Sequence, residues 1–214
     1  MPFPTRLTVV LVGRERKRLL SVFVKATRRR GRALLQAINE ATLAELAEAG
    51  YARLTIEADA ARAGTGKAAL YRRWPAKRDL VLDALNAALP DLTQPLDEAA
   101  DLREALLACL QSMSDVLAGR TAFPPVAVLV EVLREAELGD GFRDRLIAAR
   151  IELVRSAVER AADRGEIDRS AITPLAIRTG PALVLQGVLM TGRPPSADEL
   201  EQIVDQIVLP ILKS

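Results

Sequence analysis

Residues 54–80 read LTIEADAARAGTGKAALYRRWPAKRDL, and this stretch decides the fold of the chain. Thr55 precedes an apolar-periodic run, as an N-cap residue should, which predicts a first helix. The Gly-Thr-Gly sequence at 64–66 predicts that this helix ends and that the chain turns. A second helix of about two turns is expected over 67–72, because Trp74-Pro75 disfavours helix beyond it. Helix-turn-helix proteins use such a pair to present the second helix to the DNA major groove.

Positive charge is concentrated at the end of this stretch. The twelve residues 67–78 contain five basic side chains and no acidic one, on the segment that would face DNA phosphates. Gly turns between short helices also occur in all-helical proteins that bind no DNA, so this pattern alone leaves the function open. The basic residues are Lys67, Arg72, Arg73, Lys77 and Arg78.

In finer detail, the stretch resembles the DNA-binding domain of the TetR/AcrR family of one-component transcriptional regulators. That family has Thr at the cap of its second helix, an Ala-Gly turn, and a recognition helix that runs into Leu-Tyr and an aromatic-Pro-x-Lys segment. The matching residues here are Thr55, Ala63-Gly64, Leu70-Tyr71 and Trp74-Pro75-Ala76-Lys77. The resemblance is strong over residues 32–89 and weak beyond them, where helix number and length carry it.

The resemblance implies an all-α fold, with a three-helix helix-turn-helix head followed by a C-terminal regulatory and dimerisation bundle of about six helices. We expect a basic, flexible N-terminal extension over 1–31, a DNA-binding domain over 32–80, and a ligand-binding and dimerisation domain over 81–214. Apolar periodicity and capping signals agree with this division. The expected helices cover about 32–49, 56–63, 67–72, 76–89, 102–118, 124–136, 141–163, 173–191 and 196–211, with a linker at 90–95.

Charge is distributed unevenly along the 214 residues. Residues 1–32 hold ten basic side chains and one acidic, whereas residues 90–214 hold thirteen basic and twenty acidic ones. Residues 33–89 hold seven of each sign. A basic N-terminal part followed by an acidic remainder is typical of a DNA-binding head on a body that does not bind DNA. Because half of all residues are apolar but only 3% are aromatic, we expect an aliphatic core.

The chain contains no His and a single Cys, Cys109. It therefore cannot form a Ser-His-Asp triad, a Cys-His pair or a His/Cys zinc cluster, and we expect no enzymatic activity, cofactor or metal site. Cys109 lies on the apolar face of an expected helix, which favours a core residue over a redox sensor. A single Cys also suits the reducing cytoplasm. No apolar run approaches the about 20 residues of a spanning helix, so we expect no membrane partner.

The N-terminal segment admits two interpretations over residues 1–24. One is a flexible basic arm that reaches neighbouring phosphates or the minor groove. The other is a misassigned translation start, because the first helix of the family usually begins close to the N-terminus. After this segment, we expect Arg30 and Arg32, with the adjacent Arg28 and Arg29, to contact DNA.

The resemblance also implies roles for residues of the head. Lys67 and Ala68, at the start of the recognition helix, are expected to face base edges. Tyr71 and Lys77 match positions that contact phosphates in the family. Whether either arginine after Tyr71 reaches a guanine or a phosphate stays open. The full expected DNA-binding set is Arg30, Arg32, Thr55, Lys67, Ala68, Tyr71, Arg72, Arg73 and Lys77.

Two positions depart from the family pattern. Ala69 stands where the family usually has Thr, so a hydroxyl contact to a phosphate is absent. Asp59 occupies a position that is usually aliphatic, and a buried unpaired carboxylate is costly. We therefore expect Asp59 either to pair with a basic neighbour or to lower the stability of the head. The surrounding core is expected to contain Leu46, Ile56, Leu70 and Trp74.

The body is expected to enclose a mainly aliphatic pocket for a small-molecule effector between its packed helices, where ligand sites commonly lie. Seven polar or adaptable side chains are candidates for its lining, and each is equally compatible with ordinary surface or core. They are Gln111, Met113, Ser114, Glu131, Arg134, Gln186 and Met190.

One recognition helix contacts too few base pairs for useful affinity, so such heads bind in pairs, and we expect a palindromic double-stranded DNA operator. In the family the last two helices of each subunit form the homodimer interface, and here both carry apolar stripes. The same stripes would also serve to pack the subunit's own core. The candidate interface residues are Leu183, Val184, Val188, Ile203, Ile207 and Ile211.

Together these features favour a cytoplasmic, homodimeric, sequence-specific transcriptional regulator, and specifically a repressor released by a small-molecule effector. The alternative is a helical interaction or scaffold protein whose basic N-terminus binds nucleic acid without sequence preference. Preference for one DNA sequence in a competition assay separates the two. The effector, the operator, the regulated genes and the choice between repressor and activator stay open.

Overall fold

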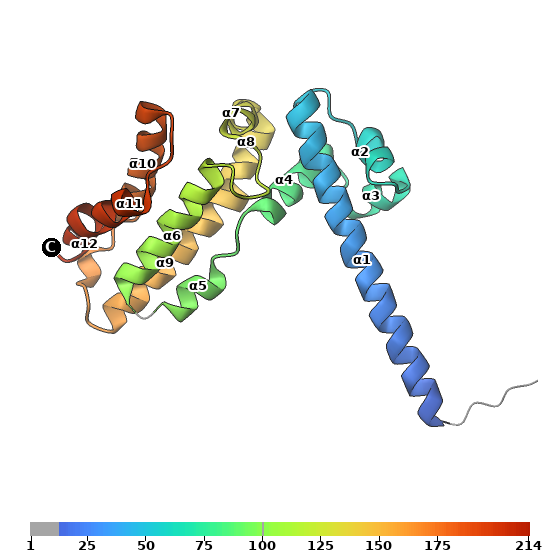
Figure 1. Ribbon diagram of the computed structural model, residues 1–214, viewed down its shortest axis with the longest axis horizontal. Helices are drawn as coiled ribbons and strands as arrows, with labels where there is room; N and C mark the ends of the chain where they lie inside the picture. Colours follow the sequence, from blue (N-terminus) through green and yellow to red (C-terminus); the bar gives the residue numbers. More distant parts are fainter. Residues whose placement is uncertain (1–12, 100) are drawn as a thin grey trace, which may run out of the picture.

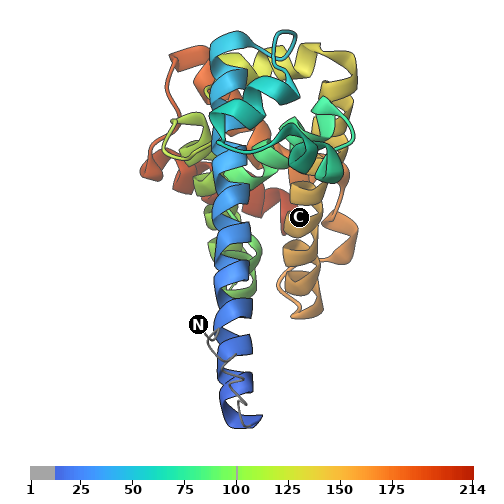
Figure 2. The ribbon, with the colours of Figure 1, turned by 90° about the vertical axis from the view of Figure 1, so that its right-hand side faces the viewer.

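The computed structural model describes residues 13–99 and 101–214, with side chains from residue 31 onward except at positions 94, 95 and 98. These residues form helices and connecting segments without a strand (Figure 1, Figure 2), so the predicted all-α fold is confirmed. Within the described ranges, no helix is both long and apolar enough to cross a membrane.

Helix α1 (Gly13–Ala49) begins well before the predicted start at Arg32. Its N-terminal half projects away from the rest of the molecule in both ribbon views. Residues 14–30 are rich in Arg and Lys and contain no Pro or Gly, so helical backbone continues through the segment that we expected to be flexible. A single Gly31 within the helix costs only about 1 kcal/mol. Residues 1–12 of the predicted arm and the side chain of Arg30 lie outside the described residues.

The predicted helix-turn-helix pair is present as α2 (Ile56–Arg62) and α3 (Lys67–Arg73). The Thr55 hydroxyl accepts a hydrogen bond of 3.2 Å from a backbone N–H in the first turn of α2, as expected for its cap. Gly64 then turns the chain with a φ of +65°, a conformation that costs Gly no Cβ clash. Helix α3 ends at Arg73, and the backbone of the following residue, Trp74, is extended.

A small hydrophobic core holds the head together. The indole Nε1 of buried Trp74 donates a 2.7 Å hydrogen bond to Oδ2 of Asp83. Leu46, expected in this core, packs instead in a second cluster at the C-terminal end of α1. The head core consists of Ile38, Ile56, Ala60, Leu70, Trp74 and Leu80.

The body contains the expected helices and one more. Helix α5 (Thr93–Glu98) starts inside the segment 90–95 that we predicted as a linker, so that prediction is wrong. The helix expected from Gly141 already begins at Ala136, because the chain turns at Glu135. The other body elements are α6 (Leu102–Leu117), α7 (Val126–Arg134), α8 (Ala136–Phe142), the π-helical segment η1 (Arg143–Ile147), α9 (Ala148–Asp163), the 3-10 segment η2 (Arg169–Ala171), α10 (Pro174–Thr191), α11 (Ala197–Ile203), the π-helical segment η3 (Val204–Val208) and α12 (Leu209–Leu212).

Head and body share a hydrophobic cluster, which we call the joint cluster. Helix α4 (Lys77–Ala88) lies between the two parts and contributes Val81, Leu82 and Leu85 to it. The end of α1 contributes Leu46, and α7 and α8 contribute the body side. The joint cluster therefore connects α7 and α8 to the head through direct packing. The buried members are Leu46, Leu54, Val81, Leu82, Leu85, Ala88, Phe123, Val132, Leu138, Phe142 and Leu146.

The body has its own core between α6, α9, α10 and the C-terminal helices. Cys109 packs against this core, as predicted, and burial raises the pKa of its thiol to about 11. Ser196 and Glu199 form the expected capping box at the start of α11. These contacts give the body a largely aliphatic interior.

Candidate nucleic-acid interface and effector pockets

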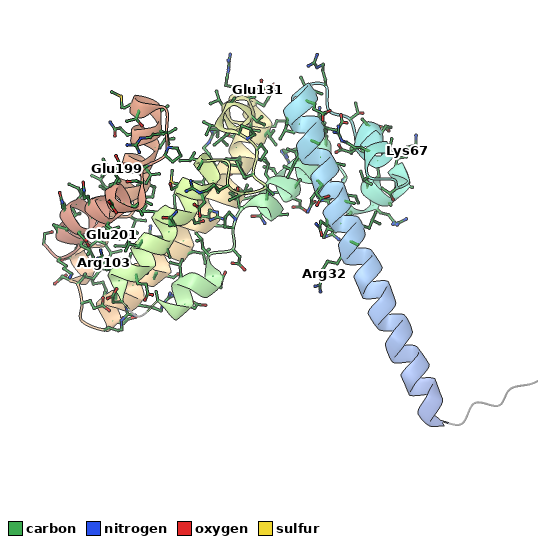
Figure 3. All side chains as sticks on the ribbon, in the orientation of Figure 1. Arg32, Lys67, Arg103, Glu131, Glu199 and Glu201 are labelled. Carbon is green, nitrogen blue, oxygen red and sulfur yellow. The ribbon has the colours of Figure 1, made fainter. Side chains whose placement is uncertain are left out.

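Helix α3 is anchored by buried Leu70 and presents basic side chains to solvent. Lys67, Ala68 and Arg72 are exposed, and Figure 3 shows Lys67 pointing outward from the helix. In the part of the chain that the structure describes, Lys67 and Arg72 have no hydrogen-bond or ion-pair partner. Exposed cations without an intramolecular partner can bind phosphates or guanine edges.

Two further candidates on α3 have partners inside the head. The Tyr71 hydroxyl donates a 3.2 Å hydrogen bond to Oε1 of Glu57. The Arg73 guanidinium lies 5.2 Å from the centroid of the Trp74 ring, within cation–π range. Both side chains are exposed, so each can exchange its partner for DNA.

Lys77 points into the protein more than the prediction implied. Its Nζ donates a 2.8 Å hydrogen bond to the carbonyl oxygen of Tyr51 and lies 4.3 Å from the centroid of the Tyr51 ring. This half-buried ammonium ties the start of α4 to the α1–α2 connection. Thr55 is exposed but uses its hydroxyl for the cap, and Arg32 points outward from α1 (Figure 3).

Asp59 is fully buried, as its position suggested. Its partner is the Thr42 hydroxyl at 3.0 Å from Oδ2, not a basic side chain, while Oδ1 has no partner among the described atoms. Burial raises the pKa of Asp59 to about 6, against the opposing effect of the Thr42 hydrogen bond. Nearby Ala69 is half-buried and offers no hydroxyl.

An ion-pair cluster between α2 and α1 was not predicted. Arg62 lies 2.9 Å from Oε1 of Glu45 and 2.6 Å from Oε1 of Glu48. The two glutamates stand at i and i+3 on α1, and this spacing puts them on one helix face. This spacing was the available sequence signal, but Arg62 is 14 or more positions further along the chain, so no short sequence window indicates the pairing. The cluster connects α2 to the C-terminal part of α1 within the head.

The seven candidate effector residues do not line one pocket. Gln111 donates a 3.0 Å hydrogen bond to Asp115 at the surface, and Met113 packs against the body core. Met190 is 74% exposed, and Gln186 lines an open groove of about 390 Å³ between α10 and α11. Glu131 and Arg134 line a different cleft of about 570 Å³. In this structure these positions lie in different places on the body, so their contact with one effector stays a prediction.

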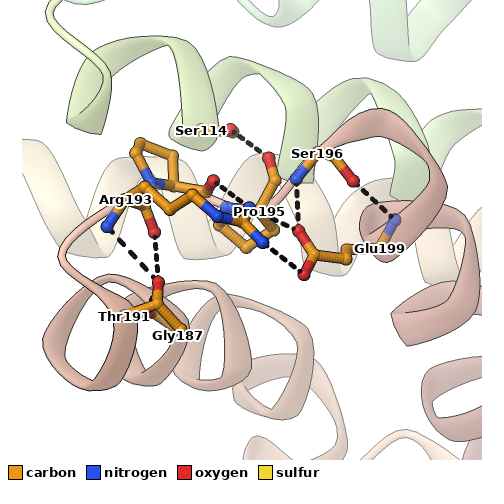
Figure 4. A network of polar contacts seen from close by, with 8 residues as sticks. Ser114, Gly187, Thr191, Arg193, Pro195, Ser196 and Glu199 are labelled. Carbon is orange, nitrogen blue, oxygen red and sulfur yellow. Dashed lines mark hydrogen bonds and ion pairs between the residues drawn. The ribbon is translucent and has the colours of Figure 1, made fainter.

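Ser114 is buried and has a structural role. Its hydroxyl donates a 3.2 Å hydrogen bond to the carbonyl oxygen of Pro195, which ties α6 to the α10–α11 connection (Figure 4). In the same connection, Arg193 pairs with Glu199 at 2.8 Å, and this contact lowers the pKa of Glu199 to about 2. The network holds α11 in place, and Arg193, Pro195 and Glu199 also line the open groove between α10 and α11.

The interior between α6, α9 and α10 is tightly packed. A cavity of only about 10 Å³ lies there, beside Cys109. A Cβ atom at Gly180 would lie 3.1 Å from Leu110, so this Gly lets α10 approach α6 closely. The lining is aliphatic apart from the Cys and consists of Leu106, Cys109, Leu110, Val154, Ile177, Gly180, Pro181 and Val208.

Most of the candidate dimer residues lie at or near the surface. Ile207 is 42% exposed and Ile211 is 39% exposed. Val184 is an exception, because it is fully buried in the subunit's own core and cannot reach a second subunit. Leu183, Val188 and Ile203 are half-buried beside the exposed positions.

Two parts of the chain match known families. Residues 38–84 match the family described as "Bacterial regulatory proteins, tetR family", and residues 96–207 match "Tetracyclin repressor-like, C-terminal domain". An uncharacterised HTH-type transcriptional regulator of Mycobacterium tuberculosis strain H37Rv is 36% identical over 171 residues, which cover 80% of this chain and 84% of that protein.

Solved structures share the fold. The TetR family transcription regulator SCO0332 aligns with a TM-score of 0.62 and 24% identity over 82% of this chain and 96% of its own. The regulator FadR from Bacillus subtilis, solved in complex with stearoyl-CoA, aligns with a TM-score of 0.59 and 19% identity. That alignment covers 84% of this chain and 97% of FadR.

Proposed function

Because the chain belongs to the TetR family of helix-turn-helix transcriptional regulators, we propose that it is a homodimeric repressor that a small-molecule effector releases from a palindromic DNA operator. The observation that carries this proposal is the exposed face of α3, where Lys67 and Arg72 lack partners in the described part of the chain. Helix α3 enters the major groove, with Lys67 and Ala68 at base edges and Arg72 at a guanine or phosphate. As such a regulator, it works in the cytoplasm and needs neither a cofactor nor a catalytic residue.

The remaining contacts position the head on the DNA backbone. Tyr71 exchanges its hydrogen bond to Glu57 for one to a phosphate oxygen, and Arg73 leaves the Trp74 ring in the same way. Arg32, exposed on α1, adds a backbone contact outside the recognition helix. Because Lys77 is bound to Tyr51, it holds the head together and contributes to DNA binding mainly through its charge.

A second copy of the chain covers apolar surface on the last helices. Leu189 and Met190 are each 74% exposed on α10, and Ile207 and Ile211 are 42% and 39% exposed on η3 and α12. Large exposed apolar side chains on the last helices are typical of an interface. Two-fold pairing places two α3 helices about 34 Å apart, or at a multiple of that distance, and thereby selects a palindromic site.

The effector acts on the distance between the two heads. Its site develops from the aliphatic interior between α6, α9 and α10, which opens when the helices separate. The complex of FadR with stearoyl-CoA supports the idea that this fold accommodates a largely apolar ligand. The joint cluster transmits helix displacement to the head, and the effector needs unequal affinity for the two head spacings.

A competition assay tests DNA recognition. Fluorescence anisotropy at fixed salt compares DNA from upstream of the chain's own gene and its neighbours with shuffled DNA of equal length and composition. We expect a clear preference for one upstream fragment and a loss of affinity in Arg72→Ala. If Arg72 binds a phosphate, the slope of the logarithm of the binding constant against the logarithm of the salt concentration should decrease in magnitude by about one in this variant. Arg155→Ala, on α9, serves as the charge-matched control and keeps wild-type affinity. Equal affinity for upstream and shuffled DNA would instead favour a non-specific nucleic-acid-binding protein.

A further inference from the structure

A cleft of about 570 Å³ lies where the head meets the body. One wall is the end of α1 with the following connection, residues 49–53, and the other is the C-terminal end of α7 with Glu131, Arg134 and Glu135. In Figure 3, Glu131 is labelled at α7, next to the C-terminal end of α1. The volume falls within the range of about 300–1,000 Å³ that is usual for small-molecule sites.

The cleft carries side chains of both charge signs that form no ion pairs with one another. Arg53 and Arg134 contribute two cations, and Glu131 and Glu135 contribute two anions. None of the four forms an ion pair with another residue that the structure describes. Arg53 uses only its Nε, which donates a 2.9 Å hydrogen bond to a carbonyl oxygen at the end of α1. The remaining donors and carboxylate oxygens are free to bind a ligand.

The rest of the lining is less polar. Ala49, Ala52 and the ring of Tyr51 belong to the lining. Lys77 covers the Tyr51 ring from one side, 4.3 Å from its centroid. Tyr51 is half-buried, and burial raises the pKa of its hydroxyl, so this group stays neutral near pH 7. A matching ligand combines a compact apolar or aromatic group with one ammonium and one carboxylate group.

We propose that this cleft binds a small zwitterion of the amino-acid type, with its ammonium at Glu131 and Glu135 and its carboxylate at Arg134 and Arg53. The site is separate from the aliphatic interior that we assign to the effector. Charge-assisted hydrogen bonds to both ends would favour a zwitterion over a ligand with a single charge.

The cleft is placed to alter the position of the head. The Glu131 carboxylate oxygen would lie 3.3 Å from a Cβ atom at Gly50, so body and head touch there. On the head side, Tyr51 holds Lys77, the first residue of α4. A ligand bound between the walls changes this contact and with it the DNA affinity; this second effect rests on the proposed function.

Calorimetric titration of the full chain with L-phenylalanine tests the site without DNA. Phenethylamine and 3-phenylpropanoate carry the same ring with only one of the two charges. We expect L-phenylalanine to bind more tightly than both, and Glu131→Gln and Arg134→Gln each to weaken its binding about tenfold. Asp144→Asn, which removes one charge outside the cleft, keeps wild-type binding.

Absence of L-phenylalanine binding, or equal binding by the wild type and both cleft variants, would overturn the proposed site. Circular dichroism checks that each variant is folded, which is expected because all three exchanged side chains are exposed. DNA affinity with and without L-phenylalanine is then measured separately. Binding in the cleft with unchanged affinity for a DNA fragment that the protein recognises would overturn the coupling and leave the site standing.

Discussion

The hydroxyl oxygen of Thr42 lies 3.0 Å from Oδ2 of Asp59, and it also lies 2.9 Å from the carbonyl oxygen of Ile38. A hydroxyl has one proton, so it can donate to only one of these two acceptors. Below about pH 6 a protonated Asp59 can donate to Thr42 while Thr42 donates to Ile38, whereas at higher pH the Thr42 hydroxyl donates to the Asp59 carboxylate. Because the pKa of Asp59 is raised to about 6, the head changes between these two arrangements within a moderate pH range.

The first prediction concerns the stability cost of this carboxyl group. Asp59→Ile removes a buried acid and leaves the Thr42 hydroxyl bonded to Ile38, so the melting temperature at pH 7.5 should rise by several degrees. Thr42→Val should lower it, because Oδ2 of Asp59 then loses its partner. Differential scanning calorimetry of both variants and the double variant provides the check. An unchanged or lowered value for Asp59→Ile contradicts the account.

The second prediction is a pH dependence. Because the folded pKa of Asp59 is about 6 and the unfolded value is near 3.8, the folded state binds more protons between these values. Stability from this group is complete below about pH 4 and is lost as the pH rises through 6, by an amount on the order of 2–3 kcal/mol. Urea unfolding of wild type and Asp59→Asn from pH 4 to pH 7.5 measures the difference. A difference that does not change with pH would exclude a raised pKa.

The third prediction compares two glycines of the same helix region. Gly50 has a φ of +77° and a prospective Cβ contact at 3.3 Å, so Gly50→Ala should destabilise the protein by about 1–2 kcal/mol. Gly31 has nothing within 4 Å and lies inside α1, so Gly31→Ala should stabilise by up to about 1 kcal/mol. Chemical unfolding measures both. If Gly31→Ala has no stabilising effect and Gly31→Pro is tolerated, α1 does not continue through this position.

A fourth prediction concerns Cys109. Because burial raises the pKa of its thiol to about 11, Cys109 is protonated at pH 8, and its side chain is partly buried against the body core. We expect negligible reaction with a disulfide reagent in the folded protein and one equivalent of reaction after unfolding in guanidinium chloride. Rapid modification without denaturant would show that the interior opens readily.

Local signals in the sequence were sufficient for the helix-turn-helix unit. Thr55, Gly64 and Trp74 act on their immediate neighbours through a cap, a left-handed turn and a helix stop, so their effect can be read from short windows. The early start of α1 was missed because the segment contains good helix formers without a capping signal. Helix α5 was missed because Pro90 and Pro95 indicated a linker.

Contacts between distant residues could not be predicted from such windows. Asp59 was recognised as unusual, but its partner Thr42 lies on another helix. Val184 fits an apolar stripe equally well whether it faces its own core or a second subunit, and only packing decides between them. The cleft at the head–body junction depends on Glu131 reaching Gly50, which no pattern within α7 implies.

The central claim is that two copies of α3 read a palindromic DNA site. Hydroxyl-radical footprinting on upstream DNA tests it most directly, with wild-type protein and Lys67→Ala, whose exposed position should leave the fold intact. We expect two protected half-sites whose centres lie about 34 Å apart or at a multiple of that distance, and weak or absent protection with Lys67→Ala. Uniform protection without half-sites, or an unchanged footprint with Lys67→Ala, would contradict the claim.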